Sequence, residues 1–139
     1  MTQGEVRVGW QDLSRFTRDV FVRAGLPPED AETEAAVLIW ANLHGVDSHG
    51  VLRIPLYMEW IDTGLMNPRP DIRIANETAA TLLVDADFAL GPVVTTMVMR
   101  RVMDKAREAG LGWGLIRNTT HQGAMAYYSL MAAQEGMAG

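Results

Sequence analysis

The spacing of hydrophobic residues predicts three helices in the first half of the chain. Between residues 10 and 24, apolar side chains recur at helical intervals and charged side chains stand between them. A second helix is expected over residues 28–43, because Pro28 suits a first helical turn and a wide apolar surface follows it. A third helix is expected over residues 52–63. Pro55 favours a start close to itself, since proline is tolerated only in a first turn.

The hydrophobic pattern changes at residues 66–70, where two prolines disfavour regular structure. The elements expected after it are two strands, a long helix, a third strand and a last helix, at residues 71–76, 79–85, 91–109, 111–116 and 123–135. The chain is therefore expected to join a helical domain, residues 1–66, to the start of an α+β or α/β domain, residues 67–139. An unpaired sheet edge in that second part predicts a covering partner or a longer natural polypeptide.

Composition and charge narrow the class of protein. Of the 139 residues, 48% are hydrophobic and 21% are charged, as in soluble globular domains. The formal charge of −5 provides no broad attraction to nucleic acid or to an anionic membrane, so neither is an expected partner. The absence of cysteine excludes disulfides and thiolate catalysis. Met1–Val8 lacks a signal-peptide pattern and no stretch is long and apolar enough to span a bilayer, so a cytoplasmic location is expected.

The most informative segment places His49, Arg53 and Tyr57 at intervals of four residues, which on a helix would share one face. An arginine fork can bind a carboxylate through two hydrogen bonds, while a nearby imidazole exchanges a proton with an oxygen at C2. Interconversion of a 2-oxo and a 2-hydroxy acid needs both groups. The alternative is a salt bridge from Arg53 to Glu59 or Asp62. In that case Tyr57 packs in the core.

Another histidine, His121, lies between a predicted strand and a predicted helix, and such loops often bind ligands in open sheets. A surface or structural role is the alternative for any one of these histidines. A metal site formed by His44, His49 and Asp47 is disfavoured, because the HExxH pattern and a further ligand are both missing. No metal is therefore predicted. The chain also contains neither a GxGxxG nor a Walker-type phosphate loop.

The segments around these histidines resemble the second malate/lactate dehydrogenase family. The likeness is carried, in order and spacing, by ANLHGVDSHGVLRIPLY, GLMNP, VDAD with the following LG, and RNTTHQGAMAYY, at residues 41–57, 64–68, 84–91 and 117–128. It runs from about residue 10 to residue 139. The GVDSHG-x2-R-x-P motif, followed at this distance by a His-x-Gly-Ala segment, is far more specific than either piece alone.

The resemblance implies an NAD(P)-dependent oxidoreductase that transfers a hydride between the nicotinamide of NAD or NADP and a small anionic 2-hydroxy or 2-oxo acid, or the related imine. It implies that His49 is the general acid/base at the C2 oxygen. By the same resemblance, Arg53 and Tyr57 hold the substrate carboxylate, and His121 shares the proton chemistry or orients the substrate. Ser48 joins the substrate-binding residues as support for the loop that carries His49.

The family's fold differs from a Rossmann fold. It joins a helical domain to a distinctive NAD(P)-binding α+β domain, and its members are homodimers whose active sites involve both subunits. The resemblance therefore implies that this chain is an N-terminal helical domain joined to the first part of such a domain. A homodimer is the expected assembly.

Two departures from the family pattern matter. Thr120 and Gln122 stand where the family usually has Asn and Phe, which indicates an altered pocket and an unusual substrate. Family members are also much longer, so the residues that bind the cofactor are expected mostly outside this chain, and the 139 residues alone are expected to be inactive. The competing hypothesis is a catalytically inactive fragment that serves as a dimerisation or binding module.

Overall fold

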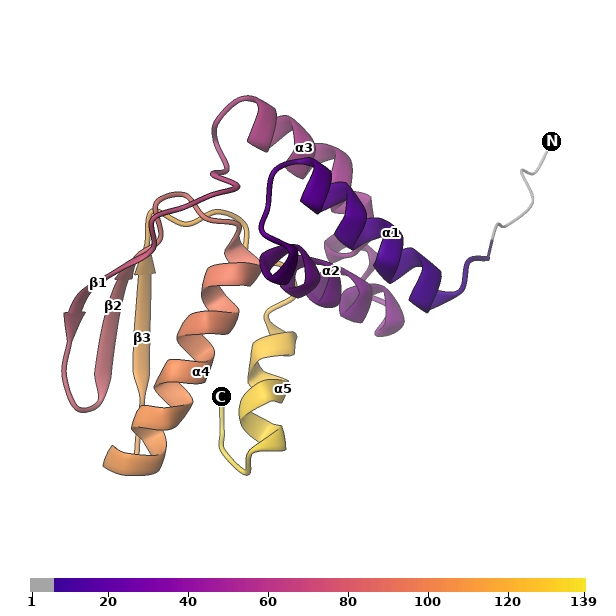
Figure 1. The fold of residues 1–139 in the computed structure, drawn as a ribbon. Helices are drawn as coiled ribbons and strands as arrows, with labels where there is room; N and C mark the ends of the chain where they lie inside the picture. The colour runs from indigo at the N-terminus through magenta and orange to yellow at the C-terminus, as the bar shows by residue number, and fades with distance from the viewer. Residues whose placement is uncertain (1–6) are drawn as a thin grey trace.

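A computed structural model describes residues 7–139 of the chain as an α+β fold (Figure 1). The first six residues, which open the predicted domain 1–66 and make up most of the segment searched for a signal peptide, lie outside the described residues. Helices from the first half of the chain lie to one side of a small sheet, and two further helices accompany that sheet. The predicted α+β class is confirmed, whereas the division at residues 66 and 67 stays a prediction.

The helices of the first half follow the hydrophobic pattern. The helix α1 spans Trp10–Arg23, α2 spans Pro28–Leu43 and α3 spans Ile54–Asp62. Pro28 opens α2, as predicted. Buried apolar residues of these helices and of the segments that follow them form one core, made of Phe21, Leu26, Ala31, Leu38, Tyr57, Met66 and Leu90. Leu90 comes from the second half of the chain, so this core also ties the sheet region to the helices.

The helix predicted over residues 52–63 is shorter than expected. Asp47–His49 and Val51–Arg53 form two 3₁₀ turns, η1 and η2, and the α-helix begins only at Ile54. Pro55 lies in the first turn of α3, where its missing N–H leaves no helical hydrogen bond unmade. The three candidate residues spaced by four therefore do not share one continuous helix. Their proximity has to come from tertiary packing.

The second half forms a mixed sheet with the order β1–β2–β3. The strand β1, Arg73–Glu77, pairs antiparallel with β2, Thr81–Asp85, and β2 pairs in parallel with β3, Trp113–Arg117. The helix α4, Gly91–Ala109, connects the two parallel strands and packs on the sheet, and α5, Ala126–Gln134, lies beside α4 (Figure 1). Within residues 7–139, no helix is long and apolar enough to cross a membrane.

The boundaries of the strands and of the last helix differ from the predictions; the strands cover residues 73–77, 81–85 and 113–117. The strand expected at residues 71–76 extends to residue 77, because the turn that follows is closed by Thr78. Its N–H donates to the carbonyl of Thr81, and its hydroxyl accepts from the amide of Thr81, each at 3.0 Å. The helix expected at residues 123–135 begins only at residue 126. The preceding loop is held open by Tyr128, whose hydroxyl donates to the carbonyl of Gln122 at 2.5 Å.

One acidic residue is buried in the helical part of the fold. Glu34 of α2 is completely shielded from solvent, and neither of its carboxyl oxygens has a hydrogen-bond partner among the described residues. Burial raises the pKa of this carboxyl from its ordinary value of 4.5 to about 8, because the charged form loses its hydration. Glu34 is therefore neutral in the folded protein at pH 7, whereas it is ionised in the unfolded chain.

We expect the Glu34→Gln variant to unfold at a higher temperature than the wild type at pH 7. The contribution of the neutral acid to stability is complete below pH 4.5 and is lost as pH rises to about 8. Each pH unit within that window removes about 1.4 kcal/mol, and glutamine cannot ionise. Calorimetric Tm values across the window measure the difference. Glu32→Gln, at an exposed position of the same helix, should keep the wild-type slope. A wild-type Tm independent of pH would contradict the prediction.

Candidate active site

The loop after β3, which carries His121, is held against the start of α4. A Cβ atom at Gly91 would lie 2.2 Å from the carbonyl oxygen of His121, so the helix and the loop can meet only at a glycine. Thr120 joins the same elements, because its hydroxyl donates to the carbonyl of Ala89 at 3.0 Å and accepts from the amide of Gly91 at 3.2 Å. The position of His121 is thereby tied to the sheet region.

The residues singled out in the sequence come together in the structure. His49 ends η1, Arg53 ends η2 and Tyr57 lies in α3. The imidazole rings of His49 and His121 have centroids 5.3 Å apart, with their planes at 33°. The Tyr57 hydroxyl lies 2.6 Å from Nδ1 of His121, across 64 residues of sequence. Both histidines are only half-buried, so both are partly accessible to solvent.

Ser48 links the imidazole of His49 to the guanidinium of Arg53. Its hydroxyl lies 2.9 Å from Nδ1 of His49, and its carbonyl accepts a hydrogen bond from Nε of Arg53 at 2.6 Å. Neither terminal nitrogen of Arg53 has a hydrogen-bond partner among the described residues. The alternative drawn from the sequence is thus wrong for Arg53, which forms no salt bridge with Glu59 or Asp62 within residues 7–139.

The alternative is right in placing Tyr57 in the core, because its side chain is completely buried. Its ring lies near those of Phe21 and Trp60, with centroid distances of 6.5 and 5.9 Å. Burial, and secondly the charge of Glu34, raise the pKa of the Tyr57 phenol, so it keeps its proton at any physiological pH. Tyr57 is therefore both a core residue and the hydrogen-bond partner of His121.

The hydrogen bonds of His121 define which ring nitrogen carries its proton. The main-chain N–H of Gly123 donates to Nδ1 at 3.3 Å, and a main-chain N–H can only donate. Nδ1 is therefore the acceptor, and the Tyr57 hydroxyl is the donor in the 2.6 Å contact with it. The neutral His121 ring consequently carries its proton on Nε2. This nitrogen has no hydrogen-bond partner in the described part of the chain, so it is the one left for a ligand.

The charge of the site is set by Arg53. The pKa of His121 lies below its ordinary value of 6.5, first because burial disfavours the imidazolium, and then because Arg53 and His49 repel a further positive charge. His121 is thus neutral at pH 7, while Arg53 remains cationic. A guanidinium with free terminal nitrogens can bind a small anion, and the imidazoles beside it can exchange a proton with that anion.

The other polar cluster weighed in the sequence does not form a metal site. His44 stacks on Trp40 with centroids 4.0 Å apart, and its Nδ1 lies 2.7 Å from the Trp40 carbonyl oxygen. Asp47 is engaged by Asn42, whose side-chain nitrogen donates to it at 2.6 Å. Within residues 7–139, no group of three or more His, Cys, Asp or Glu residues could hold a metal ion.

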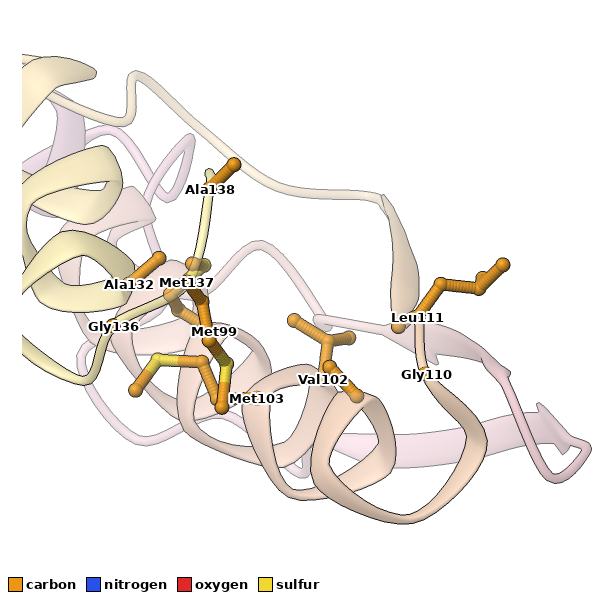
Figure 2. Close-up of a pocket in the computed structure, with 11 residues that line it drawn as sticks. Met99, Val102, Met103, Gly110, Leu111, Ala132, Gly136, Met137 and Ala138 are labelled. Atoms are coloured by element: carbon orange, nitrogen blue, oxygen red, sulfur yellow. The ribbon is translucent and has the colours of Figure 1, made fainter.

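An apolar groove lies apart from the histidines, between α4 and the C-terminal segment (Figure 2). Its volume is about 410 Å³, and methionine side chains from both segments line it. Its lining residues carry no ionisable side chain; they are Met99, Val102, Met103, Ala106, Gly110, Leu111, Gly112, Ala132, Gly136, Met137 and Ala138. The groove therefore lacks the groups needed for chemistry on an acid, in contrast to the space beside the two imidazoles.

Two participants in the site were missed in the sequence. Asn42 bonds to Asp47 and Val51, on either side of His49, and Gly123 donates its main-chain N–H to His121. A polar residue near the end of a helix ordinarily faces solvent, so no local pattern marks Asn42. Both contacts become visible only when the loops have folded back on their neighbours.

Comparison with known proteins shows what the chain as a whole is similar to. Residues 8–139 match the sequence profile of a family described as malate/L-lactate dehydrogenase. The chain is 41% identical over 134 residues to a malate dehydrogenase of Pyrococcus abyssi, a match that covers 96% of this chain and 37% of that protein. It is 40% identical over 121 residues to an L-sulfolactate dehydrogenase of Methanocaldococcus jannaschii, covering 87% of this chain and 35% of that protein.

The fold is also similar to solved structures. It matches the malate dehydrogenase of Pyrococcus horikoshii OT3 with a TM-score of 0.92 and 40% sequence identity, covering 94% of this chain and 38% of that chain. The match to the sulfolactate dehydrogenase of Methanocaldococcus jannaschii has a TM-score of 0.90 at 37% identity. The chain spans little more than a third of the length of the relatives it matches.

Replacing Arg53 by glutamine is expected to raise the pKa of His121. Burial is the larger cause of the depressed pKa and is retained, so the new value should still lie below 6.5. An NMR titration that follows the imidazole resonances of His121 measures the change. Arg101→Gln, at an exposed position of α4, removes the same charge elsewhere and should have no effect. Equal His121 titrations in the wild type and in Arg53→Gln would show that the guanidinium does not act on this ring.

Proposed function

Because this chain belongs to the malate/L-lactate dehydrogenase family, we propose that the polypeptide carrying it transfers a hydride between NAD or NADP and a small 2-hydroxy or 2-oxo acid. The observation that supports this proposal best is the 5.3 Å approach of the His49 and His121 rings beside Arg53. The acid presents two oxygen-bearing groups, a carboxylate and the oxygen on C2. The site holds a cation for the first and imidazoles for the second.

Arg53 binds the substrate carboxylate in this proposal. The hydrogen bond from its Nε to the Ser48 carbonyl holds the guanidinium in place, and the two terminal nitrogens are left for a ligand. A carboxylate accepts two parallel hydrogen bonds from such a fork. Because the chain carries a net charge of −5, this local cation is needed to attract an anionic substrate.

His49 exchanges the proton at the C2 oxygen. Reduction of a 2-oxo acid adds a hydride to C2 and a proton to its oxygen, and oxidation of the 2-hydroxy acid removes both. His121, neutral and protonated on Nε2, donates a hydrogen bond to the same oxygen and polarises the C2 carbonyl. The two imidazoles thus have different roles, since only His49 changes its protonation state during the reaction.

The role of Tyr57 differs from the one implied by the family resemblance, which placed its hydroxyl on the substrate carboxylate. In the structure this hydroxyl donates to Nδ1 of His121, and the whole residue is buried. We therefore propose that Tyr57 acts through His121, by holding the ring in the tautomer that presents Nε2–H to the substrate. Ser48 acts in the same indirect way on His49 and Arg53.

We propose no phosphate site for NAD(P) at the start of α4. The N-terminus of α4 beside the His121 loop is closed, because the Gly91 amide already donates to Thr120. We propose that the dinucleotide is bound largely by segments equivalent to those parts of the relatives that lie outside the matched stretch. The homodimeric assembly and the cytoplasmic location implied by the resemblance stay predictions.

The His49→Ala variant of the whole polypeptide is expected to lose at least about 10²-fold in kcat, because a positioned general acid/base contributes that much to turnover. Steady-state kinetics with a 2-oxo acid and NADH or NADPH measure the loss. His44→Ala is the matched control, since His44 precedes the same loop but stacks on Trp40 outside the site. Full turnover in His49→Ala would defeat the role assigned to this imidazole.

The 139-residue chain alone is expected to bind NADH and NADPH weakly or not at all, because the cofactor site is proposed to lie mostly outside the matched stretch. The chain contains four tryptophans, so their fluorescence reports binding during a titration with either nucleotide. The expected result is no saturable change at micromolar concentrations. Saturation in that range would place a cofactor site within these residues and contradict the proposal.

A further inference from the structure

The side-chain amide of Asn42 bridges the loop that carries His49. Asn42 lies in the last turn of α2, and its Nδ2 donates to a carboxylate oxygen of Asp47 at 2.6 Å. Its Oδ1 accepts from the main-chain N–H of Val51 at 2.9 Å. One side chain thus binds the residue two positions before His49 and the residue two positions after it.

The contact at Gly50 shows how closely the loop approaches this amide. A Cβ atom at Gly50 would lie 2.2 Å from Oδ1 of Asn42 and 2.4 Å from its Cγ. Any other residue would therefore force the loop or the Asn42 side chain to move. Gly50 is buried and Asn42 is half-buried, whereas Ser48 on the outer side of the loop is exposed. The amide occupies the inner side of the loop and acts as its support.

The chemistry of the bridge requires an amide at position 42. The main-chain N–H of Val51 can only donate, and the carboxylate of Asp47 can only accept. The side chain between them must therefore accept on one atom and donate on another. Asparagine does both, whereas an aspartate would face Asp47 with a second negative charge and an alanine would leave both groups unpaired.

We propose that Asn42 is a positioning residue of the candidate site, whose bridged loop sets the orientation of His49 and Arg53. The two 3₁₀ turns that end at these residues meet at Gly50, directly over the amide. Both contacts of Ser48, with the imidazole of His49 and with the guanidinium of Arg53, lie within or next to the bridged segment. The effect on turnover rests on the proposed function, whereas the effect on the loop does not.

Exchanging donor and acceptor tests the bridge in the 139-residue chain. Asn42→Asp is expected to speed hydrogen exchange of the Val51 amide by at least about tenfold and to shift the imidazole ¹⁵N resonances of His49. In the double variant Asn42→Asp/Asp47→Asn, the amide at position 47 is the donor. The carboxylate at position 42 accepts from this amide and from the main-chain N–H of Val51. It should return both signals towards the wild type. Asn76→Asp, at an exposed position of β1, is the control that should change neither.

A second variant keeps the test decisive if Asn42→Asp does not fold. Asn42→Ala removes both hydrogen bonds without adding a charge and should give the same two signals. The proposal is overturned if the double variant, folded with the wild-type Tm, stays as impaired as Asn42→Asp. It is equally overturned if Asn42→Ala leaves the Val51 exchange and the His49 resonances unchanged.

Turnover of the whole polypeptide separates this proposal from the proposed function. The kcat is expected to fall about tenfold in Asn42→Asp, with a smaller change in KM for the acid, and to recover in the double variant. Suppose that the NMR signals change in Asn42→Asp and recover in the double variant, but even the wild type shows no dehydrogenase activity. The proposed function then fails and the positioning role stands. If the wild type is active and kcat is the same in the wild type, in Asn42→Asp and in the double variant, the link from Asn42 to the reacting groups is refuted.

Discussion

A buried hydrogen bond between the Tyr57 hydroxyl and Nδ1 of His121 joins the helical half of this chain to its sheet half at the candidate site. Tyr57 belongs to the core of the N-terminal helices, and His121 belongs to the loop that leaves the sheet. Because the phenol is fully buried, breaking this bond would leave a desolvated donor without a partner. The free-energy penalty of such a donor exceeds the net stabilisation that one hydrogen bond provides. The bond therefore ties the position of the second imidazole to the packing of the first core.

The same bond organises the electrostatics of the site. The Gly123 N–H makes Nδ1 of His121 an acceptor, so Tyr57 donates in this bond and the remaining proton lies on Nε2. Burial and the nearby positive charge of Arg53 lower the pKa of the ring and keep it neutral. Glu34 adds to the raised pKa of the Tyr57 phenol only once it is ionised, above a pH of about 8. Arg53 is left as the cation that faces a ligand. In the proposed function, one of the two imidazoles exchanges a proton and the other only donates a hydrogen bond, although both belong to histidine.

In the proposed function, the residues beside the two imidazoles bind the acid rather than the dinucleotide. Arg53, His49 and His121 converge from two loops, while the N-terminus of α4 is closed by Thr120. The chain covers little more than a third of the relatives it matches, among them malate and L-sulfolactate dehydrogenases. In the proposed function, the matched stretch thus supplies the acid-binding side of a site whose cofactor side lies elsewhere.

The sequence by itself determined the α+β class, the extents of α1, α2 and α4, and the identity of the candidate residues. Hydrophobic periodicity, proline at a first turn and a family motif are all local signals, readable along the chain. Only the tertiary structure decided that residues 47–53 form two 3₁₀ turns, that Tyr57 serves His121, and that Asn42 holds the loop of His49. The roles of Tyr57 and Asn42 depend on hydrogen bonds between groups 64 and 9 residues apart, whose partners meet only once the chain has folded.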